Sequence, residues 1–145
     1  MDTTRIRPIA ICLLRNGNRI LVSEGFDTVQ QSYFYRPLGG GIEYGETSEA
    51  AISREIREEL SVEIENIQLL GVLENIFTYQ GEFGHEIVFV FDADFTDKSL
   101  YELEEIDGYE QEANIEFKAK WKYLEEIEQN GGRLVPGDLL SFLPT

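Results

Sequence analysis

Cysteine is nearly absent from this chain: Cys12 is the only one among 145 residues, so no internal disulfide can form. Its surroundings, the apolar run IAICLL, predict a small buried thiol. This run is far too short to span a bilayer, and the first residues, MDTTRIRPIAICLL, lack the layout of a signal peptide. These absences together lead us to expect a cytoplasmic protein.

Basic residues are also scarce, because 12 Lys and Arg stand against 28 Asp and Glu, which gives a formal net charge of -16. Such a surface repels long nucleic acids and anionic membranes, so we expect neither a nucleic-acid polymer nor a membrane as partner. A small phosphate ligand is not excluded. Its charge must then be met by local arginines, backbone N–H groups or bound cations.

The chain lacks internal repeats, low-complexity tracts and linkers, and its length suits one domain over residues 1–145. Several strands, one helix, more strands and short terminal helices predict a mixed α/β (α+β) domain, and exclude a doubly wound parallel sheet and a helical bundle. The first two strands are expected to form a hairpin around NGN at 16–18, and the two long strands to meet at QGEFG, 80–84. We expect strands at 7–15, 19–24, 32–38, 62–79, 85–95 and 115–121, with helices at 47–60, 123–130 and 136–143.

The expected helix 47–60 carries three glutamates on one face. Glu55 precedes Glu58 and Glu59 by three and four positions, so their side chains are neighbours, about 110° from the apolar stripe of the helix. Two carboxylates about 6 Å apart repel by roughly 3 kcal/mol at an effective dielectric near 20. Either the side chains splay into water as a solvated face, or divalent cations neutralise them. Hard carboxylate oxygens suit Mg²⁺ or Mn²⁺, and the acids alone leave both interpretations open.

A run of glycines, Gly39, Gly40 and Gly41, precedes this helix. Glycine lets the backbone approach an ion closely, so the carbonyls of this run are candidate additional ligands. Within the helix, Arg54 and Glu58 are four residues apart and can pair, which would hold the carboxylate in place.

Residues 40–62, which we call the box, carry Gly40, Glu46, Arg54, Glu55, Ile56, Glu58, Glu59 and Val62 at fixed spacings. These residues resemble the signature of the Nudix hydrolase family. That signature is Gly, five residues, Glu, seven residues, Arg-Glu, an apolar residue, any residue, Glu-Glu, any residue, Gly and an apolar residue. One position departs from it, because Ser61 replaces the last glycine, which affects the end of the helix but removes no ligand.

The resemblance implies a Nudix fold, with a mixed β-sheet between helices, and a pyrophosphohydrolase that needs Mg²⁺ or Mn²⁺. Such an enzyme cleaves the diphosphate linkage of a small nucleoside diphosphate derivative with metal-activated water; nucleoside triphosphates and ADP-ribose-like substrates both remain open. An alternative is a non-catalytic, nucleotide-sensing module of the same fold, although such modules usually lose the carboxylates that are present here. The implied metal ligands are Glu55, Glu58, Glu59 and the Gly40 carbonyl, with Glu46 and Arg54 as orienting residues.

The general base is not determined by the resemblance. The segment 101–117 is rich in glutamate, and we predict that Glu112 completes the site, with a solvated acidic loop as the alternative. Arg36 is either a phosphate contact or a surface arginine, and His85 either a substrate contact or a backbone-bonded residue at a hairpin end. The oligomeric state stays open, a homodimer included. The expected catalytic residues are Arg54, Glu55, Glu58, Glu59 and Glu112, and the expected substrate contacts are Arg36, Gly39, Gly40, Gly41 and His85.

Overall fold

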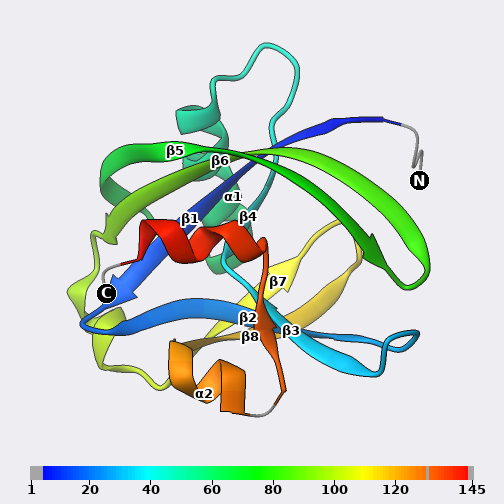
Figure 1. Ribbon diagram of the computed structural model, residues 1–145. Coiled ribbons are helices and arrows are strands. Elements are labelled where there is room, and N and C mark those ends of the chain that lie inside the picture. The colour runs from blue at the N-terminus through cyan, green and yellow to red at the C-terminus, as the bar shows by residue number, and fades with distance from the viewer. Residues whose placement is uncertain (1–4, 130, 144–145) are drawn as a thin grey trace.

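The structure, a computed structural model, describes residues 5–129 and 131–143 (Figure 1). Residues 1–4 and 144–145 of the expected domain, and Asn130 at the end of the expected helix 123–130, lie outside the described residues. The strands are β1 (Arg7–Asn16), β2 (Arg19–Asp27), β3 (Ser32–Arg36), β4 (Leu38–Gly41), β5 (Ile64–Tyr79), β6 (Glu82–Phe95), β7 (Glu105–Glu110), β8 (Ile115–Tyr123) and β9 (Arg133–Leu134). The helices are α1 (Ser48–Leu60) and α2 (Leu124–Gln129), with the 3-10 helices η1 (Lys98–Glu102) and η2 (Gly137–Phe142).

Strand β1 lies between two hydrophobic cores. It pairs in parallel with β6 and antiparallel with β4. Because strand side chains alternate between faces, residues 10, 12 and 14 join the core under α1, while residues 9, 11 and 13 join the core under α2 and η2. The expected mixed sheet between helices is therefore confirmed (Figure 1). On α1 the predicted stripe is buried: Ile52, Ile56 and Leu60 are at most 6% exposed.

The expected hairpin of the first two strands forms only at its turn. β1 and β2 pair at Arg15 with Ile20 and at Asn16 with Arg19, and β2 then leaves to pair with β3 and β8. The two halves of the sheet consequently diverge from this corner.

The glycine run is a strand rather than a free turn. Gly39, Gly40 and Gly41 form β4 with Leu38 and pair with β1. Gly39 has a φ of +152°, and a Cβ at this position would lie 2.0 Å from the carbonyl oxygen of Ala10. Glycine is required here because β4 lies so close to β1.

Two further expectations need correction. The turn between β5 and β6 is only Gln80 and Gly81, so β6 begins at Glu82, three residues earlier than predicted, while β5 ends at Tyr79 as predicted. The acidic segment 101–117 is not a loop, since β7 and β8 form a hairpin in which Asp107 faces Lys118, and such opposite charges across a ladder are stabilising. The short helix expected at 136–143 is present as the 3-10 helix η2. Among residues 5–129 and 131–143, no helix is long and apolar enough to cross a membrane.

Candidate active site

Helix α1 is the platform of the site, and both of its ends are capped. At its start, the Thr47 hydroxyl oxygen accepts a hydrogen bond from the Ala50 N–H at 3.1 Å. At its end, Ser61 takes the left-handed conformation, φ +58° and ψ +36°, and its N–H donates to the Arg57 carbonyl at 2.9 Å. The position where the signature carries glycine therefore does need a positive φ. Serine adopts this conformation at a cost of about 1–2 kcal/mol.

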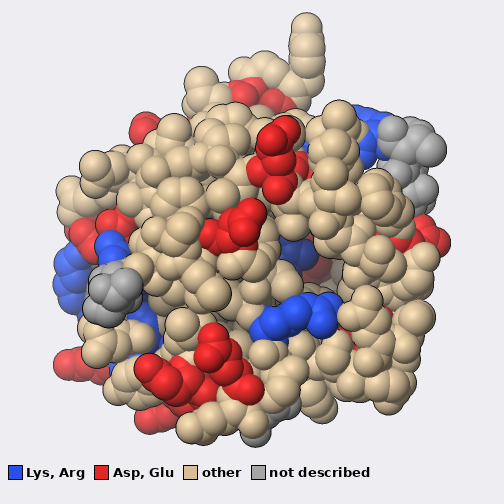
Figure 2. Space-filling view, in the orientation of Figure 1, with Lys and Arg blue, Asp and Glu red and all other residues tan. Residues whose placement is uncertain are grey.

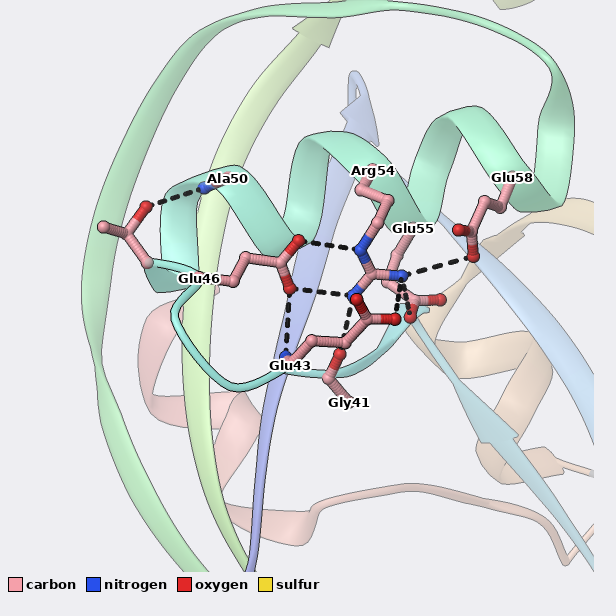
Figure 3. Close-up of polar contacts among 8 residues, drawn as sticks. Gly41, Glu43, Glu46, Ala50, Arg54, Glu55 and Glu58 are labelled. Carbon is pink, nitrogen blue, oxygen red and sulfur yellow. Dashed lines mark hydrogen bonds and ion pairs between the residues drawn. The ribbon is translucent and has the colours of Figure 1, made fainter.

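Arg54 links the acidic face of α1 to the glycine strand (Figure 3). Its Nε and Nη2 donate to the two carboxylate oxygens of Glu46 at 2.7 and 2.9 Å, and Nη2 also donates to the Gly41 carbonyl at 2.8 Å. Its Nη1 donates to Glu55 Oε1 at 2.9 Å and to Glu58 Oε2 at 3.2 Å. One guanidinium thus holds the carboxylates in place from several directions.

Glu46 is a well-anchored partner in this network. The hydrogen bond from Arg54, together with one from the Glu43 N–H, lowers the pKa of Glu46 to about 2. The Glu46 side chain is only 16% exposed, so its carboxylate interacts with Arg54 more than with solvent. Glu46 and Arg54 therefore have the geometry of orienting residues.

Glu55 lies against the backbone of β4. A Cβ on Gly40 would lie 2.5 Å from the carboxylate carbon of Glu55, so any side chain at residue 40 would displace this carboxylate. Burial raises the pKa of Glu55, as do the charges of Glu58 and Glu110, whereas the hydrogen bond and charge of Arg54 oppose the rise. Glycine at position 40 thus leaves the space that the Glu55 carboxylate occupies.

Glu59 is the most buried carboxylate of the box, at 8% exposure. Its Oε1 has no hydrogen-bond partner within the described part of the chain. Burial first, and then the charges of Glu55 and Glu110, raise its pKa to about 8; the charge of Arg36 and a backbone hydrogen bond from Gly39 oppose this. A buried carboxylate with an unpartnered oxygen is costly unless a ligand uses it.

One groove of about 730 Å³ is lined by Arg54, Glu55, Glu58 and Glu59, together with the glycine strand, Glu110 and Glu112. Among the residues described, no three acids, histidines or cysteines already stand as a metal-binding group, and the Arg54 guanidinium bridges Glu55 and Glu58 instead. The donor set nevertheless fits a hard divalent cation. It offers the free oxygen of Glu59, neighbouring carboxylates whose charges act on it, and backbone carbonyls.

Two acids of the β7–β8 hairpin reach the groove. Glu110 and Glu112 both line it, and of these two acids Glu110 is the one whose charge adds to burial in raising the pKa of Glu55 and Glu59. From the sequence we predicted Glu112 within the acidic segment 101–117. The hairpin register, which the sequence did not reveal, is what brings Glu110 to the box glutamates.

His85 is not brought to the site. It pairs with Ile76 across the β5–β6 ladder and does not line either of the two cavities described here. Its neighbour Glu86 lines both, is 6% exposed, and accepts a hydrogen bond from Asn75 Nδ2 at 3.2 Å. Because neighbouring strand residues face opposite ways, Glu86 and not His85 lines the cavities. The expected substrate contact by His85 is therefore not supported. Glu86 is a cavity-lining residue that we did not predict from the sequence.

A second cavity, of about 760 Å³, adjoins the acidic groove. It lies between the β2–β3 and β5–β6 hairpins, and Figure 2 shows a hollow in this face with basic side chains at its wall. Arg36 lines both cavities, which gives it access to a ligand that spans them. The wall of the second cavity is largely apolar and includes Phe34, Ile76, Phe77, Tyr79, Pro136 and Leu140.

Comparison with known proteins agrees with this geometry. The NUDIX domain family model matches residues 5–137. Among curated proteins, the NAD-capped RNA hydrolases NudC of Pseudomonas fluorescens and Vibrio atlanticus are similar to this chain, at 40% and 34% identity over 67 residues. Each match covers 46% of this chain and 24% of the relative, so it spans about a quarter of the length of these relatives.

Solved structures show the same fold over most of the chain. A mutator MutT protein from Bacillus halodurans has a TM-score of 0.60 at 18% identity, covering 94% of this chain and 80% of that chain. A MutT NUDIX hydrolase from Burkholderia pseudomallei has a TM-score of 0.58 at 24% identity, covering 83% and 85%. The expected Nudix fold is confirmed.

One expectation is overturned by these relatives. The proteins named NAD-capped RNA hydrolase act on an RNA polymer, so excluding nucleic-acid polymers as partners was wrong. That exclusion treated the net charge of -16 as a barrier to any long nucleic acid. A site that acts at one end of an RNA needs to meet only the terminal phosphates, so the charge of the whole surface does not decide the matter.

Proposed function

This chain belongs to the NUDIX domain family, and from that premise we propose that it is a divalent-metal-dependent pyrophosphohydrolase acting on a nucleoside diphosphate derivative. The observation that carries the proposal is the buried, unpartnered Oε1 of Glu59 beside the Glu55 carboxylate, in a groove that adjoins a largely apolar cavity. We also propose a cytoplasmic location, which the lone and buried Cys12 supports.

In this proposal, Glu55, Glu58, Glu59 and the Gly40 carbonyl hold Mg²⁺ or Mn²⁺. A bound divalent ion supplies Lewis acidity, which neutralises charge on the diphosphate and makes water a better nucleophile. Arg54 keeps Glu55 and Glu58 oriented through its Nη1 hydrogen bonds. Each of these bonds uses one oxygen of its carboxylate, and the carboxylates would have to move closer together to surround an ion.

The hydrolysis itself is a single displacement at phosphorus. The oxygen of a water molecule forms a bond to one phosphorus atom, and the bond from that phosphorus to the bridging oxygen breaks. A carboxylate accepts the proton that the water loses. We propose Glu112 for this role, with Glu110 as its competitor, because both line the groove.

The rest of the substrate is assigned to the second cavity. Arg36 lines both cavities and carries the fork geometry that suits a phosphate oxygen. The aromatic wall of the second cavity suits a flat, partly apolar group such as a nucleobase. A diphosphate in the groove and a nucleoside in the cavity match the class of substrate proposed here.

The test is a product panel with Mg²⁺ over nucleoside triphosphates, ADP-ribose, nucleotide sugars, NAD and NAD-capped RNA. The last two are included because of the names of the NudC relatives. We expect turnover of at least one compound, and Glu58→Gln should reduce it at least about a hundredfold while the fold persists. Tight nucleotide binding without turnover would favour the sensing module, and unchanged activity in Glu58→Gln would reject the ligand assignment.

The same substrate panel can identify which carboxylate is the general base. Glu112→Gln and Glu110→Gln remove one charge each from the same hairpin, so they are matched variants. We expect the Glu112 variant to lose the rise of kcat with pH. If the Glu110 variant alone loses it, the base is Glu110.

A further inference from the structure

The tips of two hairpins are joined by side chains. Asp27, at the end of β2, is fully buried, and its Oδ1 accepts from the backbone N–H groups of Val29 and Gln30 at 3.0 and 3.1 Å. Its Oδ2 accepts from the N–H of Gln80, in the β5–β6 turn, at 3.3 Å. In return, Gln80 Oε1 accepts from the Thr28 N–H at 2.8 Å and from the Thr28 hydroxyl. We call Asp27, Thr28 and Gln80 the tip latch.

Two features of the tip latch, a buried carboxylate and a glutamine with positive φ, are unfavourable on their own. Burying a carboxylate is unfavourable unless hydrogen bonds replace its water, and Asp27 receives these from backbone of both hairpins. The β5–β6 turn has positive φ at both Gln80, +53°, and Gly81, +79°. Asparagine is the usual residue before glycine in such a turn. Glutamine is less suited to the backbone, but its longer side chain reaches Thr28.

The tip latch lies at one end of the second cavity. Gly25 and Phe34 come from the β2–β3 wall, and residues 75–79 from the β5–β6 wall. Tyr79, next to Gln80, packs edge-on against Phe34 with ring centroids 5.3 Å apart. In Figure 1 the two tips meet at the right of the molecule, away from the corner where β1 and β2 pair.

No β-ladder joins these two walls among the described strands: β2 and β3 pair with each other, and so do β5 and β6. β1 connects the halves and pairs with β2 at only two positions, at the opposite end of β2 from Asp27. The core under η2, which contains Tyr35 of β3 and Leu73 of β5, connects them again. At the tips the two walls are joined by the tip latch and by the Phe34–Tyr79 contact.

We propose that the tip latch sets the width of the second cavity and positions Tyr79 and Phe34 against the non-phosphate group of the substrate. This inference rests on the proposed function. Thr28, Asp27 and Gln80 are positioning residues, because they act through the two aromatic rings. A substrate without a group in the cavity does not depend on them.

The experiment compares Gln80→Asn with the wild-type protein. Asparagine keeps the turn conformation, and its side chain is one methylene too short to reach Thr28. We expect KM for the best nucleotide of the panel to rise about tenfold with kcat within about twofold, the scale of one lost hydrogen-bonding group. KM for tripolyphosphate, which has no nucleoside, should not change. Gln68→Asn, the same change at an exposed position of β5, is the control.

Hydrogen exchange gives a readout that does not need turnover. The amides of residues 75–79 and 28–31 should exchange faster in Gln80→Asn and in Thr28→Val than in the Gln68→Asn control. An unchanged KM for the nucleotide, or an equal rise for tripolyphosphate, overturns the positioning role. If the wild type neither binds nor hydrolyses any nucleotide, the proposed function fails. In that case, amide hydrogen exchange at the two hairpin tips tests only whether the tip latch holds them together. Unchanged exchange in Gln80→Asn would show that it does not.

Discussion

Replacing Glu59 with glutamine should stabilise the metal-free protein at pH 8 and change its stability little at pH 4.5. The pKa of Glu59 is raised from 4.5 to about 8, first by burial and then by the charges of Glu55 and Glu110. Between these pH values the folded protein keeps a proton that the unfolded chain has lost. The free energy of unfolding contributed by this group therefore falls as pH rises through the window from 4.5 to 8.

The size of the effect follows from the shift. Each pKa unit corresponds to 1.36 kcal/mol, so the loss across the window is about 3–5 kcal/mol. Little of this is screened by solvent, because Glu59 is only 8% exposed. Glutamine carries no charge at any pH, so the variant lacks this loss. Other groups that titrate in the same window, such as Glu55, contribute to both proteins, and the comparison largely cancels them.

Urea unfolding in EDTA between pH 4.5 and 8.5 measures this difference. The fluorescence of Trp121, the only tryptophan and 4% exposed, reports the transition. Glu104→Gln removes the same charge from an exposed position and is the control. Stability curves for wild type and Glu59→Gln that run parallel across the whole pH range would refute the reasoning, since Glu59 would then ionise as freely in the fold as in water.

Three further predictions concern Ser61, Arg54 and Cys12. Ser61→Gly should raise the free energy of unfolding by about 0.5–1 kcal/mol in urea titrations, because residue 61 has a φ of +58°; a lower value would mean that serine is not strained there. Arg54→Lys should lower kcat/KM about a hundredfold with an unchanged circular dichroism spectrum, because lysine cannot make the bidentate contact with Glu46; normal kcat/KM would remove Arg54 from the orienting role. Burial and the charges of Asp92 and Asp94 raise the pKa of the Cys12 thiol, so thiol reagents should label it only after unfolding; rapid labelling of the native protein would contradict this.

Much of the core could be predicted because its signals are local. The recurrence of Ile52, Ile56 and Leu60 predicted α1 and its buried face, which packs on the sheet as expected. The run of apolar residues 9–14 predicted a strand and a buried Cys12, and β1 has a core on each face. The spacing of Glu55, Glu58 and Glu59 likewise predicted that they share one face of the helix, and all three line the acidic groove.

The remainder depends on which distant strands meet. The glycine run becomes β4 only because β1 is available as a partner, and the acidic segment becomes a hairpin because Lys118 and Lys120 face its acids. His85 and Glu86 are neighbours in sequence, and the register of β6 alone decides that Glu86 faces the cavities. The second cavity exists because β1 and β2 separate after two pairs, which no local pattern indicates.

In the proposed enzyme, the box carboxylates hold a divalent cation for hydrolysis of a phosphoanhydride. Titration of Mn²⁺ into the protein, followed by the electron paramagnetic resonance signal of the free ion, measures this binding without a substrate. We predict saturable binding to the wild type and to Glu104→Gln, and binding at least about tenfold weaker to Glu59→Gln. Equal affinity in all three proteins would mean that the ion is held elsewhere and that Glu59 is not one of its ligands.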